Sequence, residues 1–130
     1  MNRKVYQEAR TFLVYDAQHI IGYLGEEELK DYVVPGTGTT EEDEPVIWPT
    51  AYAYTGPESD GGTIMPCSNP ENYGEVANAI IRSRYSESQE LAIQRHAING
   101  DYAESGQEYE DYNDWCQQSV TIARKWVLGE

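Results

Sequence analysis

The sequence predicts an α+β protein: a small, mostly antiparallel sheet with short helices in residues 1–68, and a helical hairpin in residues 69–130. The first half alternates β-branched or aromatic residues with polar ones, whereas the second half carries helix-start signals and apolar residues at helical spacing. A length of 130 residues fits a single compact domain. The hydrophobic content is 39%, and eleven tyrosines and three tryptophans within it replace aliphatic bulk that is missing.

Strand and helix signals follow one another in the first 34 residues. Residues 10–15 alternate between two faces and predict a strand. Asp16 is a suitable N-cap, and apolar residues recur behind it at helical spacing up to Gly25, which predicts a helix of about two turns. Residues 26–34 fit either a second short helix or a strand, because so short a segment does not separate the two periods.

A polar loop and a β-hairpin are predicted next. Residues 35–45 contain two prolines, two glycines and four successive acids, which is typical of a solvated loop. Alternation resumes at residues 46–54, and the turn-forming residues 56–62 lead to a second short run at 63–65. These two runs predict a β-hairpin, and Pro49 predicts that its first strand lies at a sheet edge or bends.

Three helices are predicted from residue 69 onwards. Each begins at a capping signal: Asn69 followed by Pro70, Ser86 with Gln89, and Ser105 with Glu108. The last helix has the most regular apolar stripe. Because only the loop 99–105 joins the second and third helices, we expect them to pack as an antiparallel pair. This pairing brings Tyr109, Tyr112 and Trp115 close to Leu91, Ile93 and Ile98.

The charge of the chain excludes two classes of partner. With 9 basic and 23 acidic residues the formal net charge is 9 − 23 = −14. Such a chain repels the phosphate backbone of nucleic acid, and it lacks the polybasic cluster of a membrane-surface anchor. No apolar stretch approaches the ~20 residues of a membrane span. Arg3 and Lys4 are not followed by the apolar region and small-residue cleavage site of a secretory signal, so none is predicted. We therefore expect synthesis in the cytoplasm and partners that are other proteins.

Neither a metal site nor an enzyme is indicated by the residues that usually build them. The only possible ligand three or four residues from His19 on a shared face is Asp16, which is better used as a cap, and His96 has no Cys nearby in the sequence. Both are predicted to be ordinary, partly exposed histidines. The acids at 41–44 lack the alternating spacing of a calcium loop. Cys67 and Cys116 are predicted to be reduced thiols. We expect no catalytic residues, no metal and no cofactor.

Protein-binding candidates come from two kinds of residue. Trp48, Tyr52 and Tyr54 share one strand face at a period of two, and they either line a partly exposed interface or pack as the domain core. Tyr109, Tyr112 and Trp115 are the candidates on the last helix. The acidic docking candidates are Glu41, Glu42, Asp43, Glu44, Glu108, Glu110 and Asp111.

The C-terminal half resembles a known group of proteins. Residues 82–95 read RSRYSESQELAIQR and residues 108–116 read EYEDYNDWC. Over about 45 residues this pattern resembles the helical module of small tail-region and assembly accessory proteins of bacteriophages and prophages. The resemblance implies a non-enzymatic structural or chaperone-like protein that binds virion or assembly proteins, in the host cytoplasm during synthesis or in the virion. A homo-oligomer also suits the aromatic surplus.

A second hypothesis is an acidic DNA mimic that inhibits a basic host protein, such as a nuclease or a defence complex. Eight acids lie in residues 26–44 and six in residues 101–114. Mimicry needs carboxylates spread along one face, as phosphates are along DNA. Arg82, Arg84 and Arg95 lie between the two bands and interrupt such a strip, so protein binding without mimicry is favoured.

Overall fold

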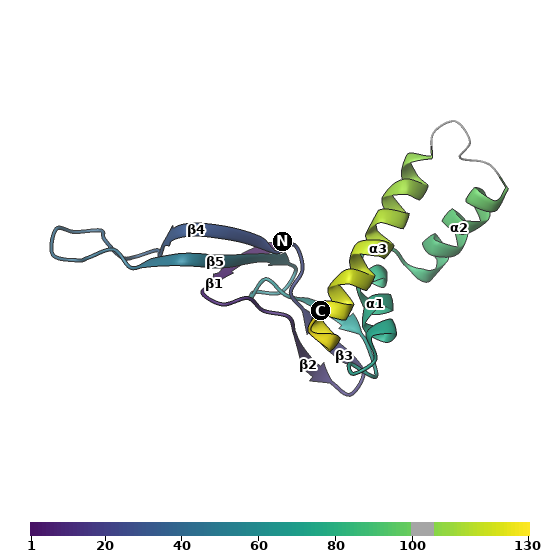
Figure 1. The fold of residues 1–130 in the computed structure, drawn as a ribbon, viewed down its shortest axis with the longest axis horizontal. Helices are drawn as coiled ribbons and strands as arrows, with labels where there is room; N and C mark the ends of the chain where they lie inside the picture. Colours follow the sequence, from purple (N-terminus) through teal and green to yellow (C-terminus); the bar gives the residue numbers. More distant parts are fainter. Residues whose placement is uncertain (100–105) are drawn as a thin grey trace. The chain divides into compact units, whose positions relative to one another are not determined.

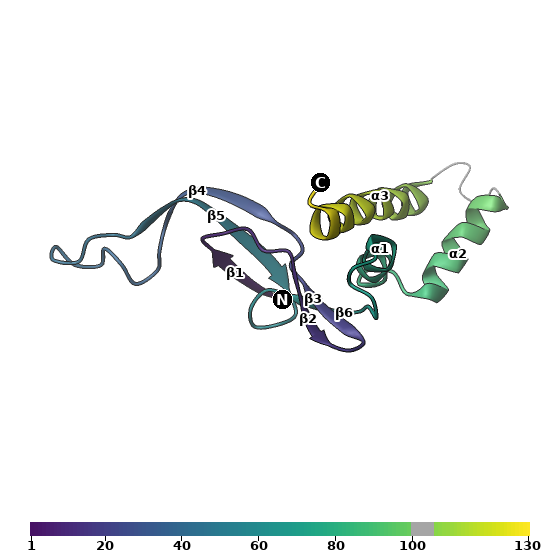
Figure 2. The same ribbon diagram turned by 60° about the horizontal axis from the view of Figure 1, so that its bottom comes forward.

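The computed structural model describes residues 1–99 and 106–130 and confirms the α+β fold class. Within these residues the chain forms two three-stranded antiparallel sheets and three helices (Figures 1 and 2). The chain divides into two compact units. Unit 1 comprises residues 1–13 and 21–64, and unit 2 comprises residues 14–20 and 65–130.

Unit 1 contains a sheet with the strand order β1-β5-β4. Its strands are β1 (Asn2–Tyr6), β4 (Glu27–Val33) and β5 (Ile47–Gly56). β1 pairs only with the second half of β5, because the register ends where Tyr6 lies opposite Tyr52. β4 pairs with β5 as far as Val33 opposite Ile47. β4 and β5 therefore continue beyond β1 as a two-stranded hairpin, which is visible in Figure 1.

The sequence predictions for this region are confirmed in part. The open assignment of residues 26–34 resolves to the strand β4, and residues 35–45 form the predicted loop between β4 and β5. The predicted hairpin between 46–54 and 63–65 is wrong, because β5 pairs with β1 and β4 while residues 63–65 lie in a strand of the other sheet. The turn that follows β5 is tight: a Cβ on Gly61, whose φ is +81°, would lie 2.6 Å from the carbonyl oxygen of Tyr54.

Pro49 interrupts the pairing of β5 with β4. Lys30 pairs with Thr50 and Tyr32 with Trp48, but Asp31 and Pro49 form no pair between them. Asp31 has a φ of 52°, in the left-handed region. β5 is the central strand of the sheet, but β1 does not reach the part that contains Pro49, so Pro49 itself lies at a free edge of β5, one of the two alternatives that the sequence predicted.

Three tyrosine rings form the core of unit 1. Tyr54 is completely buried, Tyr23 is 3% exposed and Tyr6 is half-buried. Their ring centroids lie 5.8 to 6.1 Å apart, two of the three pairs in edge-to-face geometry. The Arg10 guanidinium lies 4.5 Å from the ring centroid of Tyr6 and 4.6 Å from that of Tyr23. This cation–π contact joins the segment after β1 to the tyrosine core.

Each of these tyrosine hydroxyls has a hydrogen-bond partner. Tyr54 donates to Glu26 Oε1 at 2.7 Å and accepts from the backbone N–H of Arg10 at 2.8 Å. Tyr23 donates to Asp60 Oδ2 at 2.8 Å. Tyr6 donates to the backbone carbonyl of Asp60 at 2.6 Å. The core therefore fixes the strand β1, the turn after β5 and the start of β4 through polar as well as apolar contacts.

The second sheet has the strand order β2-β3-β6, and the boundaries between the two units fall within its strands. The strands are β2 (Phe12–Asp16), β3 (His19–Gly22) and β6 (Thr63–Pro66). The predicted strand at 10–15 is confirmed as β2. The predicted helix after Asp16 is wrong, because Asp16 Oδ1 accepts from the N–H of Gln18 in a turn, and β3 follows. A two-turn helix gains few internal hydrogen bonds, whereas the paired isoleucines favour a strand.

Unit 2 contains the three helices. They are α1 (Tyr73–Arg82), α2 (Glu87–Ile98) and α3 (Gln107–Leu128). The N-cap of α1 is Asn72, whose side chain accepts from Gly74 and Glu75, so the prediction of Asn69 is wrong. Asn69 instead holds the preceding turn by accepting from the N–H of Glu71. The capping box of Ser86 and Gln89 is confirmed at α2. Ser105 lies outside the described residues, and Gly106 precedes α3 without a side-chain cap.

The helices of unit 2 pack mainly through α1 and α3, which lie side by side in Figures 1 and 2. Val76 and Ile80 of α1 and Ala123 of α3 are completely buried. α2 joins this core through one cluster, in which Ile93 meets Ile81 and Tyr112. The other expected α2 contacts are wrong: Leu91 is 54% and Ile98 is 85% exposed, because the apolar residues of α2 do not share one face.

Alkaline titration should weaken the tyrosine core of unit 1. Burial, together with the hydrogen bond to Asp60, raises the pKa of Tyr23 to about 12. Below pH 10 the hydroxyl is protonated in both states; from about pH 10 to 12 only the unfolded chain loses this proton, so the free energy of unfolding falls as pH rises. We expect Tyr23→Phe to reduce the fall of the free energy of unfolding with pH by up to about 1.4 kcal/mol per pH unit, as measured by urea unfolding at several pH values. Tyr15→Phe, on an exposed tyrosine, is the control, and equal slopes in both variants would contradict the assignment.

The capping box of α2 should contribute measurably to stability. Ser86→Ala removes the side-chain oxygen that accepts from the N–H of Gln89 at 3.2 Å. We expect the free energy of unfolding to fall by about 1 kcal/mol, as measured by urea unfolding. Ser88→Ala, an exposed serine in the first turn of α2, is the matched control and should change it by less than about 0.5 kcal/mol. Equal effects of the two substitutions would argue against the cap.

Candidate functional site

The aromatic candidates from the sequence divide into core and surface residues. The buried ones are Tyr54, Tyr112 and Trp115. Trp115 donates from Nε1 to the carbonyl of Ile80 at 3.3 Å, and the Arg84 guanidinium lies 3.8 Å from the centre of its ring. Trp48 and Tyr52 are half-buried and Tyr109 is 39% exposed. Of these six aromatic candidates, Trp48, Tyr52 and Tyr109 therefore retain surface that another protein can contact.

The acidic candidates lie in two places, one in each unit. Glu41, Glu42, Asp43 and Glu44 are exposed in the loop between β4 and β5 of unit 1. Glu108, Glu110 and Asp111 are exposed in the first turns of α3 in unit 2. Their negative charges lie near the positive N-terminal end of the α3 dipole. Asp111 also accepts a hydrogen bond from Gln107 Nε2 at 2.7 Å. The acids of α3 thus have a structural role, whereas no side-chain hydrogen bond or ion pair from the described residues reaches those at 41–44.

Exposed apolar side chains flank the acidic loop. Val33, Val46 and Ile47 are 49%, 48% and 49% exposed. Val33 pairs with Ile47 across the two strands, so their side chains lie on one face of the hairpin. The rings of Tyr32 and Trp48, one position further from the loop, pack 5.7 Å apart. We call Val33, Val46, Ile47 and the acids 41–44 the hairpin end.

The hairpin end is held by hydrogen bonds of its own. The N–H of Val34 donates to the carbonyl of Val46 at 2.9 Å. The hydroxyl of Thr37 donates to the carbonyl of Val34 at 2.6 Å and accepts from the N–H of Val46 at 3.0 Å. Gly38 has a φ of +68° and a Cβ there would lie 2.8 Å from Cβ of Pro45. The loop therefore presents its carboxylates from a defined backbone.

The three aliphatic residues of the hairpin end were not among the binding candidates predicted from the sequence. A usable signal was present, because Val33-Val34-Pro35 and Pro45-Val46-Ile47 flank the acidic loop almost symmetrically. Two such flanks predict a strand pair that closes at the loop. The predicted hairpin instead paired residues 46–54 with residues 63–65.

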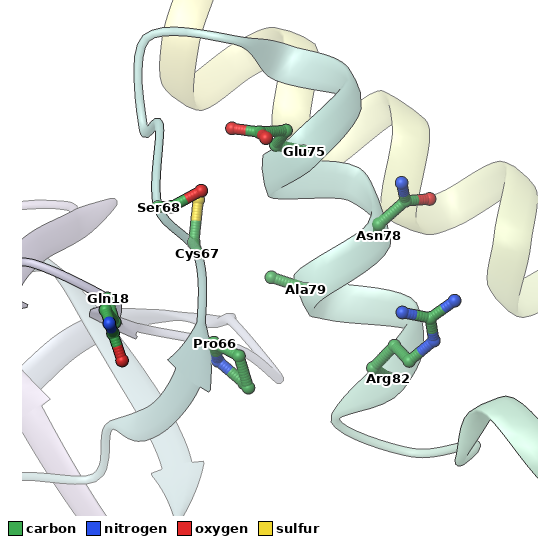
Figure 3. A pocket seen from close by; sticks show the side chains of 8 residues that line it. All are labelled: Gln18, Pro66, Cys67, Ser68, Glu75, Asn78, Ala79 and Arg82. Atoms are coloured by element: carbon green, nitrogen blue, oxygen red, sulfur yellow. The ribbon is translucent and has the colours of Figure 1, made fainter.

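Unit 2 contains a cavity of about 430 Å³ between α1 and the segment that follows β6 (Figure 3). Its lining residues are Gln18, Pro66, Cys67, Ser68, Glu75, Asn78, Ala79 and Arg82. Glu75 Oε2 is buried and has no hydrogen-bond partner among the described residues. Burial, and in smaller part the Glu75 charge, raises the pKa of the Cys67 thiol. No pattern in the sequence marked Glu75, since its exposure depends on packing between distant segments.

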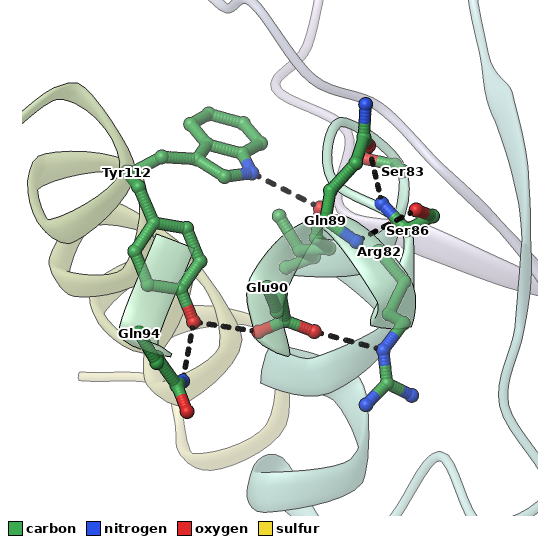
Figure 4. A network of polar contacts seen from close by, with 9 residues as sticks. Arg82, Ser83, Ser86, Gln89, Glu90, Gln94 and Tyr112 are labelled. Atoms are coloured by element: carbon green, nitrogen blue, oxygen red, sulfur yellow. Dashed lines mark hydrogen bonds and ion pairs between the residues drawn. The ribbon is translucent and has the colours of Figure 1, made fainter. Parts of the chain in front are cut away.

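Arg82, at the other end of this cavity, is held by a polar network that links the three helices (Figure 4). Its Nε donates to Glu90 Oε2 at 2.9 Å. The Tyr112 hydroxyl donates to Glu90 Oε1 at 2.8 Å and accepts from Gln94 Nε2 at 3.0 Å. Burial and the bond to Glu90 raise the pKa of Tyr112 well above its usual range. The Arg82 charge is therefore balanced within the network.

The histidines and cysteines lie in different parts of the described chain. Among residues 1–99 and 106–130 no three His, Cys, Asp or Glu side chains gather closely enough to hold a metal ion. His19 Nδ1 lies 2.8 Å from Asp16 Oδ1 in the β2–β3 turn, and both side chains are exposed. Cys67 and Cys116 are free thiols. No helix in the described residues is long and apolar enough to span a membrane.

Comparison of the chain with protein-family models, curated protein sequences and solved structures gives no match.

Removing the Glu75 carboxylate should stabilise the folded chain. A buried oxygen without a hydrogen bond destabilises the folded state by about 1–3 kcal/mol. The negative charge of Glu75 in the first turn of α1 interacts favourably with the helix dipole and stabilises it by about 0.3–1 kcal/mol. We expect Glu75→Met to raise the free energy of urea unfolding by roughly 1 kcal/mol. Glu71→Met, on an exposed acid just before α1, should change it by less than about 0.5 kcal/mol. A loss of stability in Glu75→Met would show that the carboxylate has a stabilising partner.

Proposed function

We propose that the protein is a non-enzymatic binding protein whose hairpin end docks on a basic surface of another protein. One observation carries the proposal: three half-exposed aliphatic side chains, Val33 and Ile47 on one face of the hairpin and Val46 on the other, flank a loop with four carboxylates that have no cationic partner among the described residues. Apolar side chains at the centre of a patch and charges at its rim are the usual composition of a protein interface.

The aliphatic residues and the acids have different roles in this proposal. Burying three half-exposed Val and Ile side chains releases about 1 kcal/mol each, so they supply affinity. Exposed carboxylates add little to affinity, but they steer a basic partner towards the surface and disfavour acidic ones. A second copy of this chain presents the same four acids, so charge favours a different protein over a homo-oligomer through this surface.

The kind of partner follows from the C-terminal resemblance to small phage tail-region and assembly accessory proteins. That resemblance implies a virion or assembly protein as the partner, met in the host cytoplasm during synthesis or retained in the virion. The alternative partner, a basic host nuclease or defence complex inhibited by DNA mimicry, requires carboxylates along a whole face. The unpaired acids of the hairpin end form a single short run in one loop, which favours docking over mimicry.

Threonine substitutions should test the aliphatic part of the hairpin end. Val33→Thr with Ile47→Thr keeps β-branched side chains and the strand pairing while making the patch polar. We expect the dissociation constant for a purified partner, identified by capture from infected lysate, to rise about tenfold or more. Leu91→Thr, an equally exposed aliphatic residue on α2, is the control. Binding lost in Leu91→Thr and kept in the double variant would move the interface to the helices.

The acids should govern the salt dependence of the same binding. The variant Glu41→Gln, Glu42→Gln, Asp43→Asn and Glu44→Gln removes four charges and leaves the loop backbone in place. We expect it to slow association and to reduce its dependence on salt, as measured by stopped flow, with less effect on dissociation. If the captured protein is a host nuclease that duplex DNA competes away, and none of the chain is found in purified virions, the accessory-protein proposal is overturned in favour of mimicry.

A further inference from the structure

The cavity of unit 2 contains a carboxylate with no partner. Neither oxygen of Glu75 takes part in a hydrogen bond or ion pair with the described residues, and Oε2 is shielded from solvent. In Figure 3 its carboxylate points from α1 towards Ser68 and Cys67 across the cavity. A carboxylate in this environment gains most from a group that brings both a positive charge and hydrogen-bond donors.

The opposite end of the cavity does not supply that charge. Arg82 is seven residues from Glu75 on the same helix, which separates them by about 10 Å along the α1 axis. Its guanidinium is already paired with Glu90. The uncompensated charge of the cavity is therefore negative and lies at the Glu75 end.

The lining between these ends combines two kinds of surface. Pro66, Cys67 and Ala79 contribute carbon and sulfur, while Ser68 and Asn78 contribute oxygens that accept hydrogen bonds (Figure 3). Such a lining suits a ligand with a flexible apolar stem and a compact cation at its end. A primary alkylammonium group has this form, with three donors on one nitrogen.

We propose that this cavity binds a primary alkylammonium group, with the cation at Glu75 and the alkyl stem along Ala79 and Pro66. The two sources of this chemistry are a lysine side chain of a protein and a free amine. The site belongs to unit 2 and does not depend on the hairpin end, which belongs to unit 1.

The test is an NMR titration of the full chain, with n-butylamine in one arm and Nα-acetyl-lysine-N-methylamide in the other. We expect saturable shifts of the amides of Ser68, Asn78 and Ala79 in at least one arm. Tighter binding of the blocked lysine assigns the site to a protein side chain, and equal or tighter binding of n-butylamine assigns it to a free amine. The uncharged analogue Nα-acetyl-norleucine-N-methylamide, which has the same alkyl stem with hydrogen in place of the ammonium group, should bind at least about tenfold more weakly than the blocked lysine.

Two variants separate a site at Glu75 from a general attraction to the acidic chain. Glu75→Gln should weaken binding of the tighter probe at least about tenfold, while Glu71→Gln, with the same charge change outside the cavity, should alter it less than about twofold. Asn78→Arg adds a cation to an exposed lining position and should also weaken binding, even if Glu75→Gln perturbs the fold. Equal affinities in Glu75→Gln and Glu71→Gln, or equal binding of the norleucine compound, would overturn the proposal.

Discussion

The structure depends on the need of every buried tyrosine hydroxyl for a hydrogen-bond partner. The chain has few large aliphatic residues, so aromatic rings fill its interior, and each ring carries a polar group with it. In unit 1 the hydroxyls of Tyr54 and Tyr23 are satisfied by Glu26 and Asp60. In unit 2 the hydroxyl of Tyr112 is satisfied by Glu90. Both cores are therefore fixed in position by directional bonds, and neither is a purely apolar cluster.

This constraint gives the acidic residues two separate roles. Glu26, Asp60 and Glu90 each accept a hydrogen bond from a buried tyrosine and so join segments that are distant in the sequence. The carboxylates of residues 41–44 form no hydrogen bond or ion pair with other described side chains and are exposed to solvent. Net charge alone does not distinguish these roles, because both kinds of carboxylate count equally in it. In the proposed docking, the charge that meets the basic partner is therefore that of residues 41–44, which is smaller and more local than −14.

The sequence predicted those features that depend on a few adjacent residues. The capping box at Ser86 was found because its two hydrogen bonds are reciprocal and local. The same reasoning failed at Asp16 and Asn69, which do bond to nearby backbone N–H groups but in turns, since Asp and Asn serve turns and helix caps equally well. The pairing of β1 with β5 was beyond prediction, because these strands are about fifty residues apart and no local pattern selects that pairing. The candidate sites show the same difference between local and long-range features. The acids of the hairpin end could be predicted because they are consecutive in the sequence, whereas the burial of Glu75 results from packing between distant segments.

The unpaired position of Pro49 has a consequence for the behaviour of the chain in a crowded solution. Beyond the reach of β1, one side of β5 has no neighbouring strand in the described residues, and such a side is a template for the addition of strands from other molecules. Pro49 has no N–H to offer an incoming strand, and the left-handed backbone of Asp31 opposite it breaks the regular ladder. The hairpin can therefore present apolar side chains at its end while the strands behind them resist edge-to-edge aggregation.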